Sequence, residues 1–247
     1  QHPQFCEILK TTRKDYGIIP SYTTNGNGLT PAIVEATKKY CGAVAVSAYP
    51  PYKATKKAID VLTSNQIRTN LHYLLNSETI ENVLLLLKNG SNLFENINAI
   101  IFINYKPVGK NKNNNLLLNS NKKYKELFNL INISQFPFKI GFDSCSISGI
   151  VNNLNQVNIA SIEPCEAGRF SAYVSEDLSV YPCSFMAEMC KGESLLRNNL
   201  LDIWSKSKLF SDIRDLLSGN KCKHCSYQNI CFNGCPVFSN INLCDMK

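Results

Sequence analysis

Residues 222–238 read CKHCSYQNICFNGCPVF and place four cysteines at the spacing Cys-x2-Cys-x5-Cys-x3-Cys. A fifth cysteine, Cys244, follows closely. A Cys-x2-Cys turn points two thiolates at one metal centre, and cysteines a few residues on complete a tetrahedral set or a cluster corner. Because five cysteines exceed the needs of one tetrahedral centre, the stretch predicts that some of them belong to a second centre.

Three cysteines upstream are candidates for that second centre. Cys145 ends the strand-like segment GFDSC, Cys165 stands alone, and Cys183 ends VSEDLSVYPC, which is typical of a hairpin. Together with one cysteine of the later stretch they could form a second four-thiolate site. Cys190 is assigned to neither centre, and we expect it to be a free buried thiol. His224 lies inside the Cys-x2-Cys turn, where we expect a surface residue that tunes the cluster field rather than a ligand.

Thiolates suit both iron–sulfur clusters and structural zinc, so both chemistries are considered. Zinc sites usually combine two Cys-x2-Cys turns, or one such turn with histidines. Here the second pair is Cys-x3-Cys and a further cysteine follows, which favours iron–sulfur clusters, with zinc as the alternative. Disulfides are disfavoured because the cysteine count, 11, is odd and no signal peptide precedes them.

Composition excludes several classes of function. The net charge of +7 comes from lysines spread along the chain, and no segment combines dense Lys/Arg with interleaved aromatic residues. We therefore expect a solvated surface and no nucleic-acid binding. No apolar run reaches the roughly 20 residues that cross a bilayer. These observations predict a cytoplasmic protein without membrane contact.

The first part of the chain alternates strand and helix signals, and such repeated units predict a parallel sheet, either open or barrel-like. The pattern changes near residue 140, where strands shorten and cysteines appear. We expect domains at residues 1–140 and 141–247, with an Asn/Lys-rich loop at 110–123. Expected strands are 18–26, 42–49, 67–75, 97–109 and 137–145; expected helices are 30–40, 53–65, 77–90, 124–134 and 200–217. Thr30 is the expected N-cap of the first of these helices, with Pro31 at its first position. The third should start with a capping box at Ser77 and end at Gly90. The last helix should pack through Leu201, Trp204, Phe210 and Ile213.

The segment PCEAGRFSAYVSEDLSVYPCSF (164–185), the tryptophan-bearing helix, the stretch from 222 and the final Cys244 together resemble the SPASM domain. That domain is the cluster-bearing extension of radical S-adenosylmethionine (SAM) enzymes that modify peptides and proteins. The resemblance implies two auxiliary [4Fe–4S] clusters. One set of ligands would be Cys222, Cys225, Cys231 and Cys244; the other would be Cys165, Cys183 and Cys235, with Cys145 as the candidate fourth ligand.

The chain departs from this family at the hairpin turn. The family usually has glycine five residues before the second hairpin cysteine, and this chain has Leu178 there. A turn that needs a positive φ is harder to form without glycine. We expect the hairpin to differ in shape without losing the ligand.

The N-terminal part resembles the family's barrel, through HPQF (2–5), YTTNG (22–26), AVSAY (45–49) and KPVGK (106–110) in that order. The implied fold is α/β: a partial (β/α) barrel of the radical SAM type, followed by a small cysteine-rich α+β SPASM domain. By this resemblance Ser47 is a candidate contact to SAM, and Asn25 and Asn70 are weaker candidates. The alternative is that these polar residues merely end parallel strands, where active sites of such barrels gather.

The family's radical chemistry needs a Cys-x3-Cys-x2-Cys loop, whose three thiolates leave one iron free to bind and cleave SAM. Cys6 and Cys41 cannot supply it, and the chain begins without methionine. We therefore expect a fragment of a longer enzyme rather than a degenerate one.

The resemblance implies a maturase-type enzyme, with SAM as cosubstrate, a peptide or protein substrate and an electron donor such as a flavodoxin or ferredoxin. An anaerobic sulfatase-maturating enzyme is disfavoured, because those enzymes have a catalytic aspartate where this chain has Ser184. The alternative from another class is a non-catalytic iron–sulfur or zinc module that serves electron transfer or peptide binding.

Overall fold

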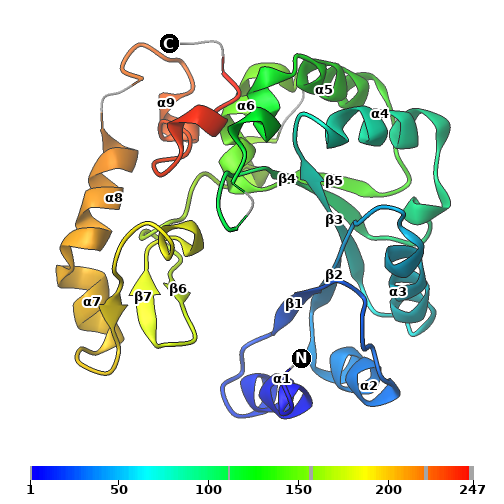
Figure 1. Cartoon of the computed structure of the whole chain (residues 1–247), viewed down its shortest axis with the longest axis horizontal. Coiled ribbons are helices and arrows are strands. Elements are labelled where there is room, and N and C mark those ends of the chain that lie inside the picture. Colours follow the sequence, from blue (N-terminus) through cyan, green and yellow to red (C-terminus); the bar gives the residue numbers. More distant parts are fainter. Residues whose placement is uncertain (1, 111, 156–157, 220–221, 245–247) are drawn as a thin grey trace. The chain divides into compact units, whose positions relative to one another are not determined.

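The computed structural model describes residues 2–110, 112–155, 158–219 and 222–244 (Figure 1). The chain forms two compact units that interleave in sequence. The first comprises Gln1–Leu75, Glu81–Ile103 and Gln135–Gly141, and the second comprises Asn76–Ile80, Asn104–Ser134 and Phe142–Lys247. The domain boundary at residue 140 stays a prediction.

The first unit is built on a parallel sheet whose five strands follow one another in chain order, β1-β2-β3-β4-β5. Strand and helix alternate as the sequence predicts, and the partial barrel with its cysteine-rich continuation is confirmed. The strands are β1 (Ser21–Thr24), β2 (Ala43–Ser47), β3 (Thr69–Leu75), β4 (Ala99–Asn104) and β5 (Lys139–Phe142); the helices are α1 (Phe5–Lys14), α2 (Pro31–Tyr40), α3 (Lys53–Ser64) and α4 (Thr79–Asn89). α5 (Lys123–Ile133) lies between β4 and β5 in the chain and belongs to the second unit.

The register of β2 and β3 separates a buried face of the sheet from a more open one. Val46 lies opposite Leu71, and both side chains are fully buried. α3 packs on this side, and its Thr55 hydroxyl donates to the Ser47 carbonyl at 3.1 Å. Since side chains alternate along a strand, Ser47 and its partner His72 point to the opposite, less buried face.

The start of α2 agrees with the capping predicted from the sequence, and the start of α4 does not. α2 begins as predicted, with the Thr30 hydroxyl accepting from the Ile33 N–H. The capping box predicted from Ser77 is wrong, because the Asn76 side chain accepts from the N–H groups of residues 78 and 79, at 2.9 and 2.7 Å. The Ser77 hydroxyl instead donates to the Asn115 carbonyl. α4 ends as predicted at Gly90, with φ 72°.

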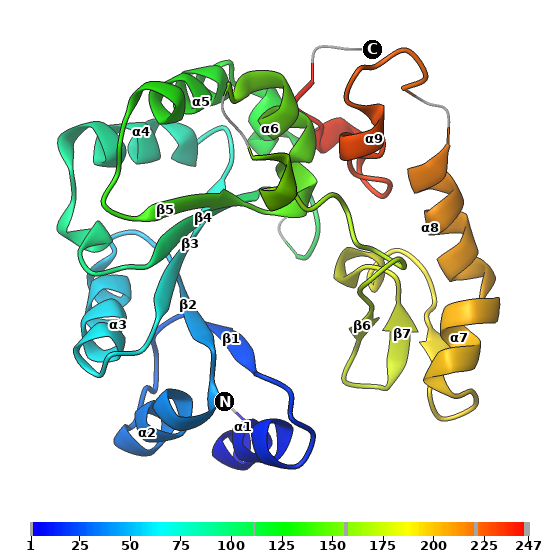
Figure 2. The same cartoon turned by 180° about the vertical axis from the view of Figure 1, so that it is seen from behind.

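The second unit combines a small antiparallel sheet with short helices (Figure 2). Its remaining elements are β6 (Tyr173–Val174), β7 (Ser179–Tyr181), β8 (Glu193–Ser194), α6 (Ile147–Asn153), α7 (Leu200–Lys206), α8 (Lys208–Ser218) and α9 (Gln228–Cys231). Single 3₁₀ turns cover Asn92–Phe94 in the first unit, and Asn114–Leu116, Leu118–Ser120, Ser144–Ser146, Ile159–Ser161, Ser184–Met186 and Ser239–Ile241 in the second. Among the described helices, none has the length and apolar character that crossing a membrane requires.

The helix predicted over 200–217 is two helices. Ser207 adopts an extended conformation, and its hydroxyl accepts from the Leu209 N–H at 3.2 Å, so that it caps α8 and ends α7. Phe210 and Ile213 are buried as expected, and Trp204 packs on Phe210. Leu201 is 74% exposed, so its predicted packing role is wrong.

The hairpin β6–β7 forms as predicted, and Leu178 takes the position that glycine holds in the family. Its φ is 62°, in the left-handed region, and its side chain is 43% exposed. A side chain there costs roughly 1–2 kcal/mol, while glycine adds an entropic cost of about 0.5–1 kcal/mol.

Leu178→Gly is therefore expected to raise the free energy of unfolding by up to about 1 kcal/mol, since strain relief outweighs the added chain entropy. Denaturant unfolding of the anaerobic protein measures the change. Leu196→Gly is the control at another exposed leucine outside the positive-φ positions, and it should not stabilise the protein. A destabilised Leu178→Gly variant would mean that the leucine side chain makes compensating contacts.

Candidate metal centres

Four cysteines, Cys222, Cys225, Cys231 and Cys244, form what we call the C-terminal cysteine set. All four line one cavity of about 280 Å³ in the second unit. The first two lie on the loop after α8, where the Cys225 N–H donates to the Cys222 carbonyl at 2.9 Å and closes the turn. Since a water molecule occupies about 30 Å³ in the liquid, the cavity has room for a polyatomic group.

The sulfurs of this set interact electrostatically. Burial raises the pKa of Cys231 to about 11; the backbone N–H of Gly234 lowers it, and the sulfurs of Cys244, Cys222 and Cys225 raise it again. A cation or cluster bound among these sulfurs would instead lower their pKa values, because metal binding requires and stabilises thiolates.

A tight turn after α9 shapes the wall of this cavity. Phe232, Asn233 and Gly234 all have positive φ. A Cβ on Gly234 would lie 2.2 Å from Oδ1 of Asn242, which accepts from the Cys235 N–H at 3.1 Å. Nδ2 of Asn233 donates to the Gly219 carbonyl at 2.9 Å, so the turn is tied to the end of α8. Asn233 and Asn242 were not among the predicted site residues; the Asn-Gly pair at 233–234 was the available turn signal.

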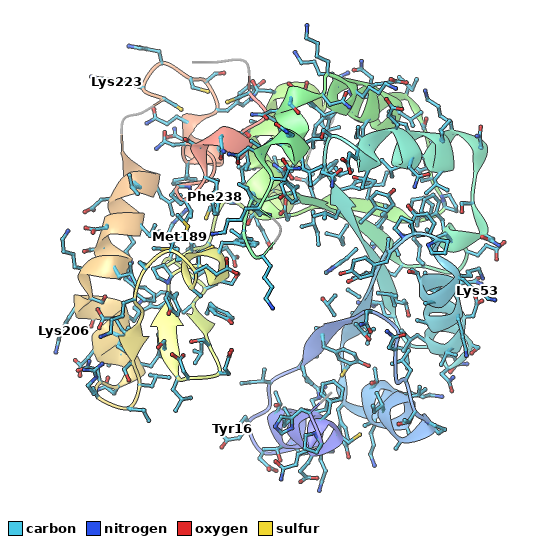
Figure 3. The ribbon with its side chains drawn as sticks, in the orientation of Figure 1. Tyr16, Lys53, Met189, Lys206, Lys223 and Phe238 are labelled. Atoms are coloured by element: carbon cyan, nitrogen blue, oxygen red, sulfur yellow. The ribbon has the colours of Figure 1, made fainter. Side chains whose placement is uncertain are left out.

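The other four predicted ligands, Cys145, Cys165, Cys183 and Cys235, form what we call the hairpin cysteine set. Cys145 and Cys235 pack in one apolar cluster, and Cys165 and Cys183 pack in another. Val237 contacts both clusters, which places them side by side. Phe238, labelled in Figure 3, packs against the first of them.

The pKa values show that these four sulfurs also interact. A hydrogen bond from Cys145 to Cys235 raises the pKa of the donor, together with its burial, and lowers that of the acceptor. The pKa of Cys165 is raised to about 11, chiefly by burial and in smaller part by the sulfurs of Cys145 and Cys183. Burial also raises the pKa of Cys183. Two buried and two half-buried thiols packed together are costly to ionise unless a positively charged group holds them.

A half-buried arginine, with one nitrogen unpaired in the described part of the chain, borders the hairpin cysteine set. Nη1 of Arg169 is buried and has no hydrogen-bond acceptor among the described residues. Its guanidinium lies over the Phe232 ring, 4.2 Å from the ring centre, and lowers the pKa of Cys165. Because an unpaired buried donor is costly, the site fits a group that brings negative charge, such as a thiolate-bound cluster.

Neither set matches a single-ion site. Within the described ranges, no group of three or more His, Cys, Asp or Glu side chains is arranged to hold one metal ion. His224 is exposed, as predicted. Cys190 is free but exposed, so the expectation of a buried thiol is wrong. It lies on the loop after Ser184–Met186, where its sulfur contacts the Met186 carbonyl at 3.6 Å instead of entering the core.

The candidate SAM contacts occupy different parts of the first unit. Ser47 is the last residue of β2 and lies on the open face. Asn25 follows β1, and its side chain accepts from the Asn27 N–H at 3.0 Å. Asn70 is the second residue of β3, toward the amino end, and accepts from the side chain of Asn98 at 2.8 Å. Ser47 and Asn25 thus lie at carboxyl ends of strands and Asn70 does not.

The arrangement defines an α/β partial barrel joined to a cysteine-lined region with two candidate centres. Residues 165–226 match the SPASM family model, described as an iron–sulfur cluster-binding domain. No curated protein sequence matches the chain. The match includes four of the eight predicted ligands: Cys165, Cys183, Cys222 and Cys225. Cys145 lies before the matched residues, and Cys231, Cys235 and Cys244 lie after them.

Two proteins of known structure share the fold of this chain. SuiB of Streptococcus suis bound to S-adenosylmethionine is 17% identical with a TM-score of 0.67, over 95% of this chain and 59% of SuiB. SuiB bound to precursor peptide SuiA is 16% identical with a TM-score of 0.69, over 100% of this chain and 63% of SuiB. Native anSMEcpe with bound AdoMet is 19% identical with a TM-score of 0.66, over 94% of this chain and 70% of that protein. This chain thus spans about three fifths of SuiB and shares its fold.

Proposed function

We propose that the two cysteine sets each bind a [4Fe–4S] cluster, and that the chain belongs to a radical SAM/SPASM enzyme that modifies a peptide or protein. The observation that supports this best is the cavity of about 280 Å³ lined by all four cysteines of the C-terminal set. The SPASM match over residues 165–226 supports the same chemistry. When bound, such clusters supply one-electron transfer at a potential that their surroundings set.

The side chains around the sets have roles that follow from their contacts. The turn at 232–234 directs Cys231 and Cys235 to different sets. The Tyr227 N–H donates to the Cys225 sulfur at 3.4 Å, and the Phe238 N–H donates to the Cys235 sulfur at 3.3 Å. Hydrogen bonds of this kind stabilise thiolates and orient them toward a shared centre.

In this proposal SAM and the substrate bind to the first unit. Ser47 is the favoured contact to SAM, because it ends β2 on the open face of the sheet. Asn25 is a second candidate, whereas the position of Asn70 near the start of β3 does not favour it. A peptide substrate is proposed because the similar structures include SuiB bound to its precursor peptide. A flavodoxin or ferredoxin would supply electrons.

Anaerobic purification followed by iron and sulfide quantification tests the cluster assignment. We expect about eight irons and eight sulfides per chain, as two clusters of the cubane type. Reduction with dithionite should give two EPR signals from paramagnetic clusters. Stoichiometric zinc without iron would overturn the proposal and favour a structural zinc module.

A further inference from the structure

Lys106 places a buried positive charge inside the second unit. The residue is only 6% exposed, and its ammonium forms an ion pair with Asp143. It also lies over the ring of Phe185, 4.9 Å from the ring centre. Desolvating a lysine is costly, so a lysine in this position needs strong compensation.

The partner carboxylate is itself held in place. Oδ1 of Asp143 accepts from the Asn104 N–H at 3.3 Å and from the Ser146 hydroxyl at 2.7 Å. These contacts orient the carboxylate, so that the ammonium is confined between it and the aromatic ring of Phe185. The position of the charge is therefore fixed by elements on both sides.

The same charge borders the hairpin cysteine set. Cys145 comes two residues after Asp143, and Cys183 comes two residues before Phe185. Burial lowers the pKa of Lys106, but Asp143 and the Cys145 sulfur outweigh it, and the pKa is raised. The Phe185 ring packs on Phe238, with ring centres 6.4 Å apart, and Phe238 packs in the apolar cluster that contains Cys145 and Cys235. The ammonium is therefore held beside the hairpin cysteine set by the residues that surround it.

A fixed cation beside a cluster has a defined physical effect. When a cluster takes up one electron from a donor such as dithionite, its negative charge grows by one unit and no bond is broken. A buried ammonium stabilises the more negative, reduced state through a medium that screens poorly. Net charge and hydrogen bonds to the sulfurs are known determinants of cluster potentials.

We propose that Lys106 raises the reduction potential of the cluster held by the hairpin cysteine set, and that Asp143 limits this effect. The inference rests on the proposed function, since it requires a cluster in that set. In this proposal Lys106 acts on the cluster through its fixed positive charge and does not coordinate iron. An ion pair with a purely structural role would instead affect only folding and cluster retention.

Redox titration followed by EPR tests the proposal, with dithionite as reductant. Lys106→Met should shift the potential of the hairpin-set cluster to more negative values, and Asp143→Asn should shift it to more positive values. The double variant removes both buried charges and should lie closer to wild type. The Cys231→Ala variant, which keeps only the hairpin-set cluster, assigns the signal. Lys112→Met removes an exposed lysine, 58% accessible, and should leave both potentials unchanged.

The outcomes separate this inference from the proposed function. If wild type lacks two clusters by iron quantification, the proposed function fails. If both clusters are present and the two single variants shift the potential in the same direction or not at all, the role of Lys106 fails. If Lys106→Met does not fold, the potential of Asp143→Asn is compared with that of the double variant. This step removes only the charge of the lysine. That step must shift the potential to more negative values, and no shift overturns the inference.

Discussion

Cys231→Ala is expected to halve the iron content of the anaerobic protein, from about eight to about four irons per chain. Cys231 ends α9, and its sulfur interacts with those of Cys222, Cys225 and Cys244. It is therefore close to the other three members of the C-terminal cysteine set. Removal of its thiolate leaves three ligands around a cavity of about 280 Å³, which is partly open to solvent through neighbouring half-buried residues.

Iron and sulfide assays, together with the EPR spectrum of the reduced protein, measure this loss. One of the two signals should disappear while the hairpin-set signal remains. Cys190→Ala is the matched control, because Cys190 is an exposed thiol outside both sets. It should keep the full iron content. Equal iron losses in the two variants would show that cysteine count, and not position, determines cluster content.

Phe210→Ala is expected to lower the free energy of unfolding by about 3–5 kcal/mol. The Phe210 side chain is fully buried and forms a cluster with Val180 of β7 and Ile203 of α7. Trp204 packs on it with ring centres 5.5 Å apart. Truncation removes this contact area and leaves a cavity between the two helices and the hairpin strand that precedes Cys183.

Thermal unfolding under anaerobic conditions should show a fall in Tm on the order of 10 °C for a chain of this size. Leu216→Ala on the same helix is the control, since Leu216 is more than half exposed and its loss should change Tm by only a few degrees. Because alanine is a better helix former than either residue, a fall of similar size in both variants would show that burial of Phe210 does not determine the loss. An unchanged Tm for Phe210→Ala would contradict the packing argument.

The regular elements of the first unit follow from the sequence because their signals are local. Buried strands read as short apolar runs, and α2 carries both Thr30 and Pro31 at its start. Two errors came from competition between local signals. Ser207 lies within an amphipathic pattern that continues across it, yet its hydroxyl caps α8. Asn76, and not Ser77, caps α4, because Asn and Ser are nearly equal as caps and tertiary contacts to residues 115 and 116 engage Ser77.

The cysteine spacing indicates candidate ligands but cannot indicate what surrounds them. The ion pair of Lys106 with Asp143 joins residues 37 positions apart, and Asn104 donates to the Ile241 carbonyl across 137 positions. No periodicity encodes such contacts. The sequence neighbours of Arg169 likewise do not reveal that its Nη1 is buried and unpaired in the described part of the chain.

The three left-handed residues between Cys231 and Cys235 have a consequence for how the two proposed clusters communicate. Only four peptide units separate the two ligands, and such a stretch spans at most about 14 Å. The turn folds it tighter still, with Gly234 pressed against Asn242. The two ligands are therefore held at a short, fixed separation by the backbone. This limits how far apart the two proposed clusters can lie, and so limits the distance for electron transfer between them.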